Sequence, residues 1–407
     1  MKSRALRRVL VIIVANRHRI ERELSFGNAH VYDWDDSVQL LKVLKNRAWT
    51  NGPFVREFES KFAEYIGCQH ALACHSGGAA IFIASLIAKI GAGDEVLVPT
   101  INFPAACHVA VLMGAKVTFV DADRETLNVD VNDFRNKISR KSKIFFPVHL
   151  YGRPLDMDAI MDISKDHNIV VVEDCAHAPG AEYKGKKVGS IGDMAIFSLQ
   201  MAKVLSTLGE GGMFVTDDDE IAERAQKLRQ WGFTDPDPDS RRFWEVGYEY
   251  ISMNFRMEDA RAAVGTSQLE KLDRNIERRT QNAKMLNQKL KGIEGLTIPP
   301  EPPSQTKHVW AYYAPVFLDE KAAGIDRDEF LNRLRDRHGI WAQAYYRPCH
   351  TLDCYRKLGY KKGVCPVAEE MAERLFCLPI YPRFSEDDID YMAESVRDIA
   401  ESARKVA

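Results

Sequence analysis

The stretch that decides the fold is MAIFSLQMAKVLSTLGEGGMFVTDD, residues Met194 to Asp218. Two short apolar runs of strand type flank a loop that carries Lys203 and ends in Gly-Glu-Gly-Gly. From this stretch alone, Lys203 is either a solvated loop lysine or an amine held beside a binding site. The choice between the two depends on what the neighbouring segments of the chain place around the loop.

Runs of the same type alternate with patterns typical of helices from about residue 70 to 235. The helical patterns include AAIFIASLIAKI, DMDAIMDISKDH and DEIAERAQKLRQW. This alternation predicts βαβ units, and therefore an α/β fold with a mostly parallel seven-stranded sheet covered by helices. The seven predicted strands are HALACH, EVLVPT, KVTFVDAD, KIFFPVHL, IVVVEDCA, MAIFSL and GGMFVTDD.

The pattern changes after Gly247. A long helical stretch with charge pairs at i, i+4 spacing, residues 258–293, is followed by the break IPPEPPSQ. We therefore expect a large domain over residues 31–270 and a smaller C-terminal α+β domain over residues 271–407. Residues 1–30 form an extension of unknown role, because their apolar run VLVIIVA is too short to span a bilayer and has no signal-peptide cleavage site.

Composition limits the kind of partner. The chain has 56 Lys and Arg residues against 58 Asp and Glu residues, so no basic field favours nucleic acid, and a small molecule is the expected partner. Nothing in the sequence indicates membrane association. The eight cysteines form no CxxC pair and no metal-binding spacing, which favours a cytoplasmic enzyme with reduced thiols and no metal.

Polar residues follow several of the predicted strands. Asp174 ends the run IVVVED, and His177 follows three residues later. Since ligands of open α/β sheets bind beyond the carboxyl ends of the strands, Asp174 is expected at a binding crevice. Two plainer interpretations remain: Asp174 can cap a helix, and His177 can be a buried histidine that fills space.

Two further segments lead to the same edge of the predicted sheet. In ACHSGGAAIFIASL, Gly77 and Gly78 open a helix, where free N–H groups and the helix dipole favour an anion. A tight turn from strand to helix also requires small residues. Phe103, at the end of VPTINF, can stack on a flat ring or belong to the core.

Together these segments predict an anion cradle, a flat platform, a carboxylate and a lysine at one site. Pyridoxal phosphate requires this set: a lysine for covalent attachment, an acid for the pyridine nitrogen, and a phosphate site. The set therefore favours the interpretation that Lys203 is an amine held beside a binding site.

At this point the sequence resembles the DegT/StrS group of sugar aminotransferases, pyridoxal-phosphate enzymes of the aspartate aminotransferase fold. The resemblance runs from about residue 30 to the C-terminus, with the motifs in the order of the family. The motifs are WTNGPFVREFESKFAEYIG, HSGGAA, VPTINF, VVEDCAHAPGAEYKGKKVGSIGD, FSLQMAKVLSTLGEGG and NFRMEDARAAVGTSQL.

The resemblance implies a role for each matching residue. Lys203 would hold the cofactor covalently, and Asp174 would keep its pyridine nitrogen protonated. The remaining assignments are ring stacking by Phe103, a cofactor contact by His177, phosphate binding by Ser198, Gly77 and Gly78, and a phosphate contact from the partner chain of a homodimer by Asn254.

The chain departs from the family pattern in the phosphate turn and beside the lysine. Gly78 replaces a Thr or Ser that many members carry, which removes a hydroxyl contact, and Gln200 stands where histidine is frequent. Some members are dehydratases with a histidine in place of the lysine, so Lys203 favours transamination.

The expected reaction moves an amino group from glutamate or glutamine to a keto-sugar, most simply a nucleotide-linked one, in amino-sugar biosynthesis. A keto-cyclitol or a free keto-sugar acid is the alternative acceptor, and a regulator that binds the cofactor without turnover is a different class of function. Arg347 and His350 can each bind a donor carboxylate or serve only the local structure.

Overall fold

The computed structural model describes residues 23–25, 32–47, 49–234 and 247–404. Its centre is a seven-stranded sheet with the spatial order β1-β9-β8-β5-β4-β2-β3. Each strand coincides with one of the seven runs predicted above, and the predicted α/β fold class is confirmed. The strands are β1 (His70–Cys74), β2 (Glu95–Pro99), β3 (Lys116–Val120), β4 (Ser142–Phe145), β5 (Val170–Asp174), β8 (Met194–Ser198) and β9 (Gly212–Thr216).

The direction of the strands determines where a site can form. Pairing is parallel between β2 and β3, β2 and β4, β4 and β5, and β5 and β8. Only β9 runs the other way, antiparallel to both of its neighbours, β8 and β1. The carboxyl ends of the other six strands therefore lie at one edge of the sheet.

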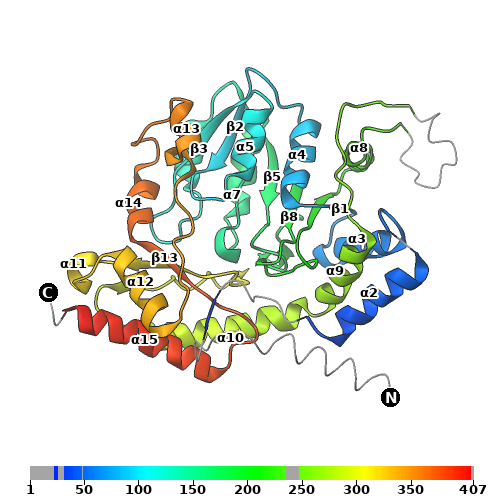
Figure 1. Ribbon diagram of the computed structural model, residues 1–407. Helices are drawn as coiled ribbons and strands as arrows, with labels where there is room; N and C mark the ends of the chain where they lie inside the picture. Colours follow the sequence, from blue (N-terminus) through cyan, green and yellow to red (C-terminus); the bar gives the residue numbers. More distant parts are fainter. Residues whose placement is uncertain (1–22, 26–31, 48, 235–246, 405–407) are drawn as a thin grey trace, which may run out of the picture.

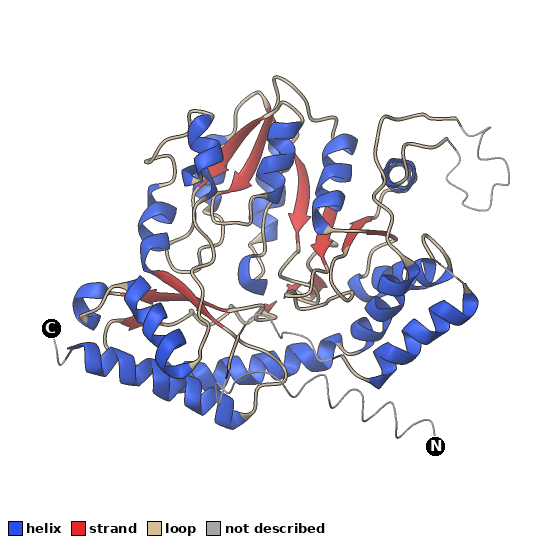
Figure 2. Ribbon diagram, viewed as in Figure 1, coloured by secondary structure: helices blue, strands red, loops and turns tan. Residues whose placement is uncertain are grey.

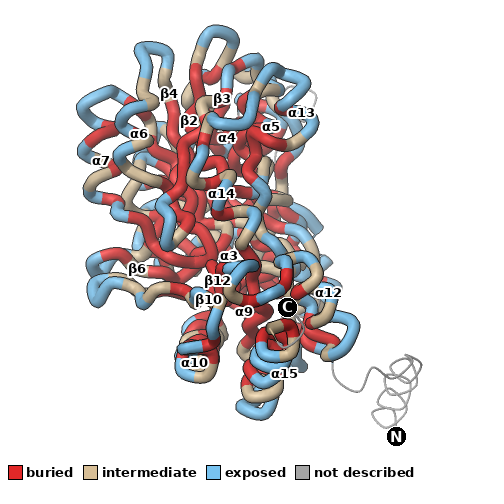
Figure 3. The backbone as a smooth tube through the Cα atoms, turned by 90° about the vertical axis from the view of Figure 1, so that its left-hand side faces the viewer, coloured by how far each residue is buried: buried red, intermediate tan, exposed pale blue. Residues whose placement is uncertain are grey.

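Helices cover both faces of this sheet, which explains why its central strands are apolar throughout. In Figure 3, α6 and α7 lie on one side of β2 and β4, and α4 and α5 lie on the other. Figure 2 shows the same layers as blue helices around red strands. The covering helices are α4 (Gly77–Ile87), α5 (Ala105–Leu112), α6 (Val131–Lys137), α7 (Met157–Asp166) and α8 (Asp219–Arg229).

A helical layer formed by both ends of the large domain packs beside β1. It contains α2 (Trp34–Asn46), α3 (Pro53–Ile66) and α9 (Asp259–Glu270). The single long helix expected over residues 258–293 is wrong in one respect, since the chain turns at Lys271 before α10 (Leu272–Leu290) begins. The Lys271 ammonium pairs there with Asp33 and Asp36 of the α2 region, which fixes the turn.

A second hydrophobic cluster lies below the large sheet, where α10 and α15 (Glu386–Arg404) run side by side (Figure 1). Its sheet has the order β10-β12-β13, and α11 and α12 flank it. Leu24, within the predicted extension, is buried in this cluster and pairs with Ile340. The remaining elements of this part are β10 (Leu296–Thr297), β12 (Tyr313–Leu318), β13 (Leu375–Leu378), α11 (Glu320–Ala323) and α12 (Arg327–His338).

The C-terminal part also returns to the large core. Cys349, Tyr355 and Cys365 are buried in the same cluster as the seven-stranded sheet. The Tyr360 hydroxyl donates to the Val117 carbonyl (2.7 Å) and accepts from the Val117 N–H (3.1 Å), which covers the edge strand β3. The elements of this segment are η4 (Cys349–Thr351), α13 (Asp353–Lys357) and α14 (Pro366–Arg374).

The boundary that we propose near residue 270 lies between α9 and α10. Four minor elements complete the described chain, three of which form a small sheet of order β11-β6-β7. No helix in the described ranges is both long enough and apolar enough to cross a membrane. The minor elements are η2 (Leu150–Gly152), β6 (Glu182–Tyr183), β7 (Lys186–Lys187) and β11 (Thr306–Lys307).

Candidate active site

The glycine turn after β1 lies against the end of β8. Ser76 caps α4, its hydroxyl accepting from the Ala79 N–H at 3.2 Å, so Gly77 and Gly78 occupy the first two helical positions. N–H groups at those positions have no acceptor within the helix and can bind an anion. A Cβ atom at Gly77 would lie 2.9 Å from the Ser198 Cβ atom, so only glycine lets the turn approach that serine.

Gly78 is under no such restriction. The only atom near a Cβ placed there is the Ser76 hydroxyl, at 3.8 Å. The structure therefore brings the turn at Gly77 and Gly78 against Ser198, and a larger side chain at Gly78 would fit.

Asp174 ends β5 and is 5% exposed. Its Oδ1 atom accepts from the Ala176 N–H at 3.0 Å. Burial raises the pKa of the Asp174 carboxyl above its usual value, against the opposing effects of that N–H group and of the Lys203 ammonium. A buried carboxylate of this kind gains most from a cationic partner.

Asn102, which sequence reasoning missed, lies beside this carboxylate. Its amide is among the groups that lower the pKa of Asp174, and its Nδ2 atom is buried without a hydrogen-bond partner among the described residues. This amide therefore faces the Asp174 carboxylate and keeps hydrogen-bonding capacity that a ligand there could use. The signal was available in the motif VPTINF, where Asn102 precedes Phe103.

Lys203 lies in the loop between β8 and β9. Its backbone N–H donates to the Gln200 carbonyl at 2.9 Å, and its side chain is partly buried. Burial lowers the pKa of the Lys203 ammonium to about 8, although Asp174 and Glu210 act in the opposite direction. At pH 7 this amine is still mostly protonated, but it loses its proton much more readily than an ordinary lysine, which favours its use as a nucleophile.

His177 is buried, and both of its ring nitrogens have partners. Nδ1 accepts from the Tyr151 N–H at 3.3 Å, so the single proton lies on Nε2, which faces the Tyr346 hydroxyl at 3.1 Å. The imidazole also stacks on the Tyr346 ring, 5.8 Å between centroids. Burial, together with the nearby Lys203 ammonium, holds the pKa of His177 well below its usual value, so the ring is neutral.

Phe103 does not belong to the core. It is 59% exposed at the beginning of the loop that leads into α5, and its N–H is held by the Asn102 side chain at 2.7 Å. An aromatic ring left exposed next to Asn102 is available to a ligand.

Asn254 is exposed, and its Oδ1 atom accepts from the Arg256 N–H at 3.2 Å. It does not cap α9, because that helix begins after Glu258. Asn254 and Arg256 line a cavity of about 380 Å³ together with Ser76, the residue that caps α4. Within one chain, Asn254 therefore lies close to the residue that begins the glycine turn.

The two residues whose roles were left open both make local hydrogen bonds, and Arg347 is exposed whereas His350 is not. Arg347 donates to the hydroxyl and the carbonyl of Thr351, each at 3.2 Å. His350 is completely buried between the Thr100 hydroxyl (2.7 Å) and the Glu369 carboxylate (2.8 Å). In this arrangement His350 is not open to a donor carboxylate.

Comparisons with known proteins identify the family of the chain. The model of the DegT/DnrJ/EryC1/StrS aminotransferase family matches residues 33–397. The GDP-perosamine synthase of Caulobacter vibrioides is 36% identical over 83% of this chain and 88% of its own. Two solved structures are similar over nearly their whole length. The aminotransferase TlmJ from Streptoalloteichus hindustanus has a TM-score of 0.85 and 29% identity, over 93% of this chain and 99% of that chain. The PLP-form of the putative sugar aminotransferase Spr1654 from Streptococcus pneumoniae has a TM-score of 0.86 and 25% identity, over 94% of this chain and 100% of that chain.

Proposed function

The chain belongs to the DegT/DnrJ/EryC1/StrS aminotransferase family and is an aminotransferase of the amino-sugar type; from this premise we propose the cofactor, the donor and the acceptor. The cofactor is pyridoxal phosphate, the donor is glutamate or glutamine, and the acceptor is a keto-sugar linked to a nucleotide. The observation that carries the proposal is a buried Asp174 carboxylate beside a Lys203 amine whose pKa burial lowers to about 8.

The residues present fit pyridoxal phosphate. The glycine turn and Ser198 offer N–H and hydroxyl groups to the phosphate, and Asp174 offers an anion to the pyridine nitrogen. The unpaired amide of Asn102 offers a donor to the ring. When bound, pyridoxal phosphate supplies an electron sink that stabilises negative charge on the amino donor.

The chain's own groups supply the acid–base chemistry. Lys203 would hold the cofactor covalently, and its amine, when free, would remove and return a proton at the donor Cα, a task that a pKa lowered to about 8 favours. Asp174 would keep the proton on the pyridine nitrogen, because a cation opposite the buried carboxylate stabilises it.

The nature of the acceptor is supported by the relatives. A GDP-perosamine synthase acts in the chemistry of nucleotide-linked amino sugars, as its name states, and it is similar over most of its length. A keto-cyclitol or a free keto-sugar acid remains the alternative acceptor. A regulator without turnover is less favoured, since binding alone does not require an acid at the ring nitrogen.

We further propose a cytoplasmic homodimer whose active sites combine residues of both chains. All eight cysteines are free, in keeping with a reducing compartment. Large apolar side chains are exposed on α2 and just before Asn254, where a second copy would cover them, including Trp34 (72% exposed), Leu44 (60%) and Ile251 (96%).

The test is a two-stage assay on the purified full-length chain loaded with pyridoxal phosphate. Glutamate or glutamine should shift the visible absorbance of the cofactor, and a nucleotide-linked keto-hexose should then restore it with formation of an amino sugar. Restoration only by a keto-cyclitol or a free keto-sugar acid would select the alternative acceptor. Binding of the cofactor without any response to either donor would support the regulator.

A further inference from the structure

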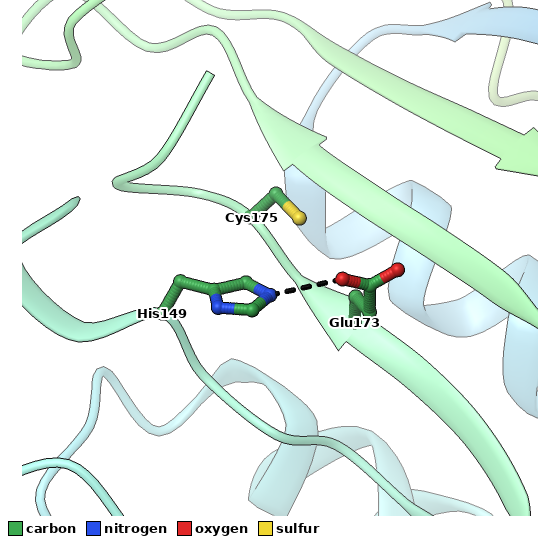
Figure 4. Close-up of side chains that lie close together, drawn as sticks. All are labelled: His149, Glu173 and Cys175. Atoms are coloured by element: carbon green, nitrogen blue, oxygen red, sulfur yellow. Dashed lines mark hydrogen bonds and ion pairs between the residues drawn. The ribbon is translucent and has the colours of Figure 1, made fainter. Parts of the chain in front are cut away.

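Directly behind the proposed site, His149, Glu173 and Cys175 form a completely buried cluster (Figure 4). Their potential ligand atoms lie within 4.8 Å of one another, a spacing that a metal ion could use. Glu173 and Asp174 are adjacent in β5, so their side chains project to opposite faces of the strand. The cluster therefore occupies the face of β5 opposite the Asp174 carboxylate.

The hydrogen bonds of the cluster favour a brace over a metal site. His149 Nδ1 accepts from the Leu155 N–H at 3.1 Å, so its proton lies on Nε2 and points to Glu173. The Glu173 carboxylate accepts four hydrogen bonds: from His149 Nε2 (3.0 Å) and from the N–H groups of Gly189 (3.0 Å), Ile191 (2.8 Å) and Gly192 (2.8 Å). A cation would have to displace these donors.

The pKa directions agree with a carboxylate that stays charged. Burial would raise the pKa of Glu173, yet the His149 imidazole and the N–H groups of the turn hold it below its usual value. Burial raises the pKa of the Cys175 thiol well above its usual value, and the carboxylates of Glu173 and Asp174 raise it further. The thiol therefore stays protonated, which makes it a poor metal ligand.

The turn that supplies three of the donors is shaped for this contact. Gly189 has φ +95°, and a Cβ atom there would lie 2.5 Å from the Phe197 ring. At Gly192, a Cβ atom would lie 3.0 Å from the Val171 carbonyl. Glycine at positions 189 and 192 therefore allows the turn to bring its N–H groups, including that of Ile191, to Glu173.

The segment that carries His149 also holds the backbone of Asp174. The His149 N–H donates to the Asp174 carbonyl at 3.1 Å, and the Asp174 N–H donates to the Pro147 carbonyl at 2.8 Å. The side chain of His149 is fixed by Glu173, and its backbone fixes Asp174. Movement of the ring would therefore be passed on to the carboxyl end of β5.

We propose that Glu173 and His149 are positioning residues, which together hold the Asp174 carboxylate at the place where it meets the pyridine nitrogen of the cofactor. This inference rests on the proposed function, since it assigns Asp174 the ring nitrogen as its partner. Neither Glu173 nor His149 touches the reacting atoms.

A double-mutant cycle on the full-length protein tests the proposal, with the dissociation constant for pyridoxal phosphate measured on apo-protein by absorbance. Glu173→Gln places an amide NH₂ opposite N–H donors and should weaken binding by about tenfold or more. If Glu173 acts through Asp174, adding Glu173→Gln to Asp174→Asn should leave the constant within about twofold of Asp174→Asn alone. Additive losses in the double variant, or an unchanged constant in Glu173→Gln, would overturn the proposal.

A second pair of variants keeps the test valid if Glu173→Gln does not fold. Gln at position 149 retains a donor that can reach Glu173, whereas Asn at that position is too short. His149→Gln should therefore bind pyridoxal phosphate nearly as the wild type does, and His149→Asn should not. Equal binding by His149→Gln and His149→Asn would contradict the brace.

A matched control lies at the opposite end of the sheet. Glu95 begins β2 and accepts from Ser139 (2.6 Å) and Lys116 (3.0 Å). Glu95→Gln should lower the midpoint of thermal unfolding without changing the dissociation constant.

Failure of the wild type itself to bind pyridoxal phosphate would refute the proposed function. Weaker binding of pyridoxal phosphate in Asp174→Asn but not in Glu173→Gln would refute only the proposed role of Glu173 and His149.

Discussion

Replacing Asp174 with Asn separates the electrostatic contribution of this residue from its packing. Asn has nearly the same volume, and its Oδ1 atom can still accept from the Ala176 N–H, which lies 3.0 Å away in the wild type. What is lost is the negative charge opposite the pyridine nitrogen. The variant should therefore fold, bind pyridoxal phosphate more weakly, and fail in the chemistry even when it is saturated with the cofactor.

The burial of Asp174 determines how much activity Asp174→Asn should lose. Asp174 is only 5% exposed, so solvent screens its charge little. Removing one partner of a buried ion pair costs about 3–5 kcal/mol. Expressed as a rate, this is a loss of between about a hundredfold and a few thousandfold in kcat/KM for amino transfer.

The stability of the apo-protein should change in the opposite direction. Burial raises the pKa of Asp174 in the folded chain, so the folded state binds this proton more tightly than the unfolded state does. Stability is then lost as the pH rises from the usual carboxyl pKa through the raised pKa of the folded chain, and the penalty is complete above that interval. Asn does not ionise, so the apo-variant should unfold at a higher temperature than the wild type at pH 7, with a difference that narrows as the pH falls towards about 4.

Steady-state kinetics of the loaded enzyme and thermal unfolding of the apo-protein measure the two effects. Near-normal kcat/KM in a variant that retains its cofactor would refute the assignment of Asp174 to the ring nitrogen. A lower unfolding temperature for the apo-variant at pH 7 would refute the conclusion that burial destabilises its charged form.

Three further outcomes are expected. Lys203→Ala should lose both turnover and the visible absorbance of covalently bound cofactor, and retention of both in the purified variant would exclude this lysine. Gly77→Ala should weaken pyridoxal phosphate binding because its methyl group would press on Ser198, whereas Gly78→Ala should bind normally; equal binding by the two would remove the steric argument for the turn. Mixing Lys203→Ala subunits with Asn254→Ala subunits should restore part of the activity, since one site of each heterodimer would hold both intact residues. No recovery, despite demonstrated subunit exchange and a measurable Asn254→Ala defect, would leave Asn254 without a role across the interface.

The seven strands could be predicted because each is a short apolar run bounded by turn residues, and the order of the runs implies parallel pairing. The position of Asp174 followed from the same principle, since parallel strands end at one edge of a sheet. These features depend on local sequence. They are therefore visible without a structure.

Contacts between distant segments were not accessible in this way. Tyr346 meets His177 across 169 residues of sequence, and His350 meets Thr100 across 250. The role of His350 was open in the sequence because a histidine beside an arginine is compatible with a surface site. Only tertiary packing shows that it is buried.

Asp174 was identified from the sequence, but the adjacent Glu173 was not. Glu173 precedes Asp174 in the motif VVEDCA, yet an alternating strand sends the two carboxylates to opposite faces. The partner of Glu173 on the far face, the turn at Gly189 and Gly192, is brought there by the chain path after β5. Two adjacent residues of one motif, Glu173 and Asp174, therefore have different structural roles.

The central claim, that Lys203 carries pyridoxal phosphate for amino transfer, is tested most directly by chemical trapping. The loaded protein is treated with borohydride, which makes the bond between cofactor and amine permanent, and its peptides are analysed by mass spectrometry with and without prior addition of glutamate or glutamine. The account predicts the cofactor on the peptide that contains Lys203, and loss of this label when the donor is added first. Label on another lysine, or on none, would contradict it.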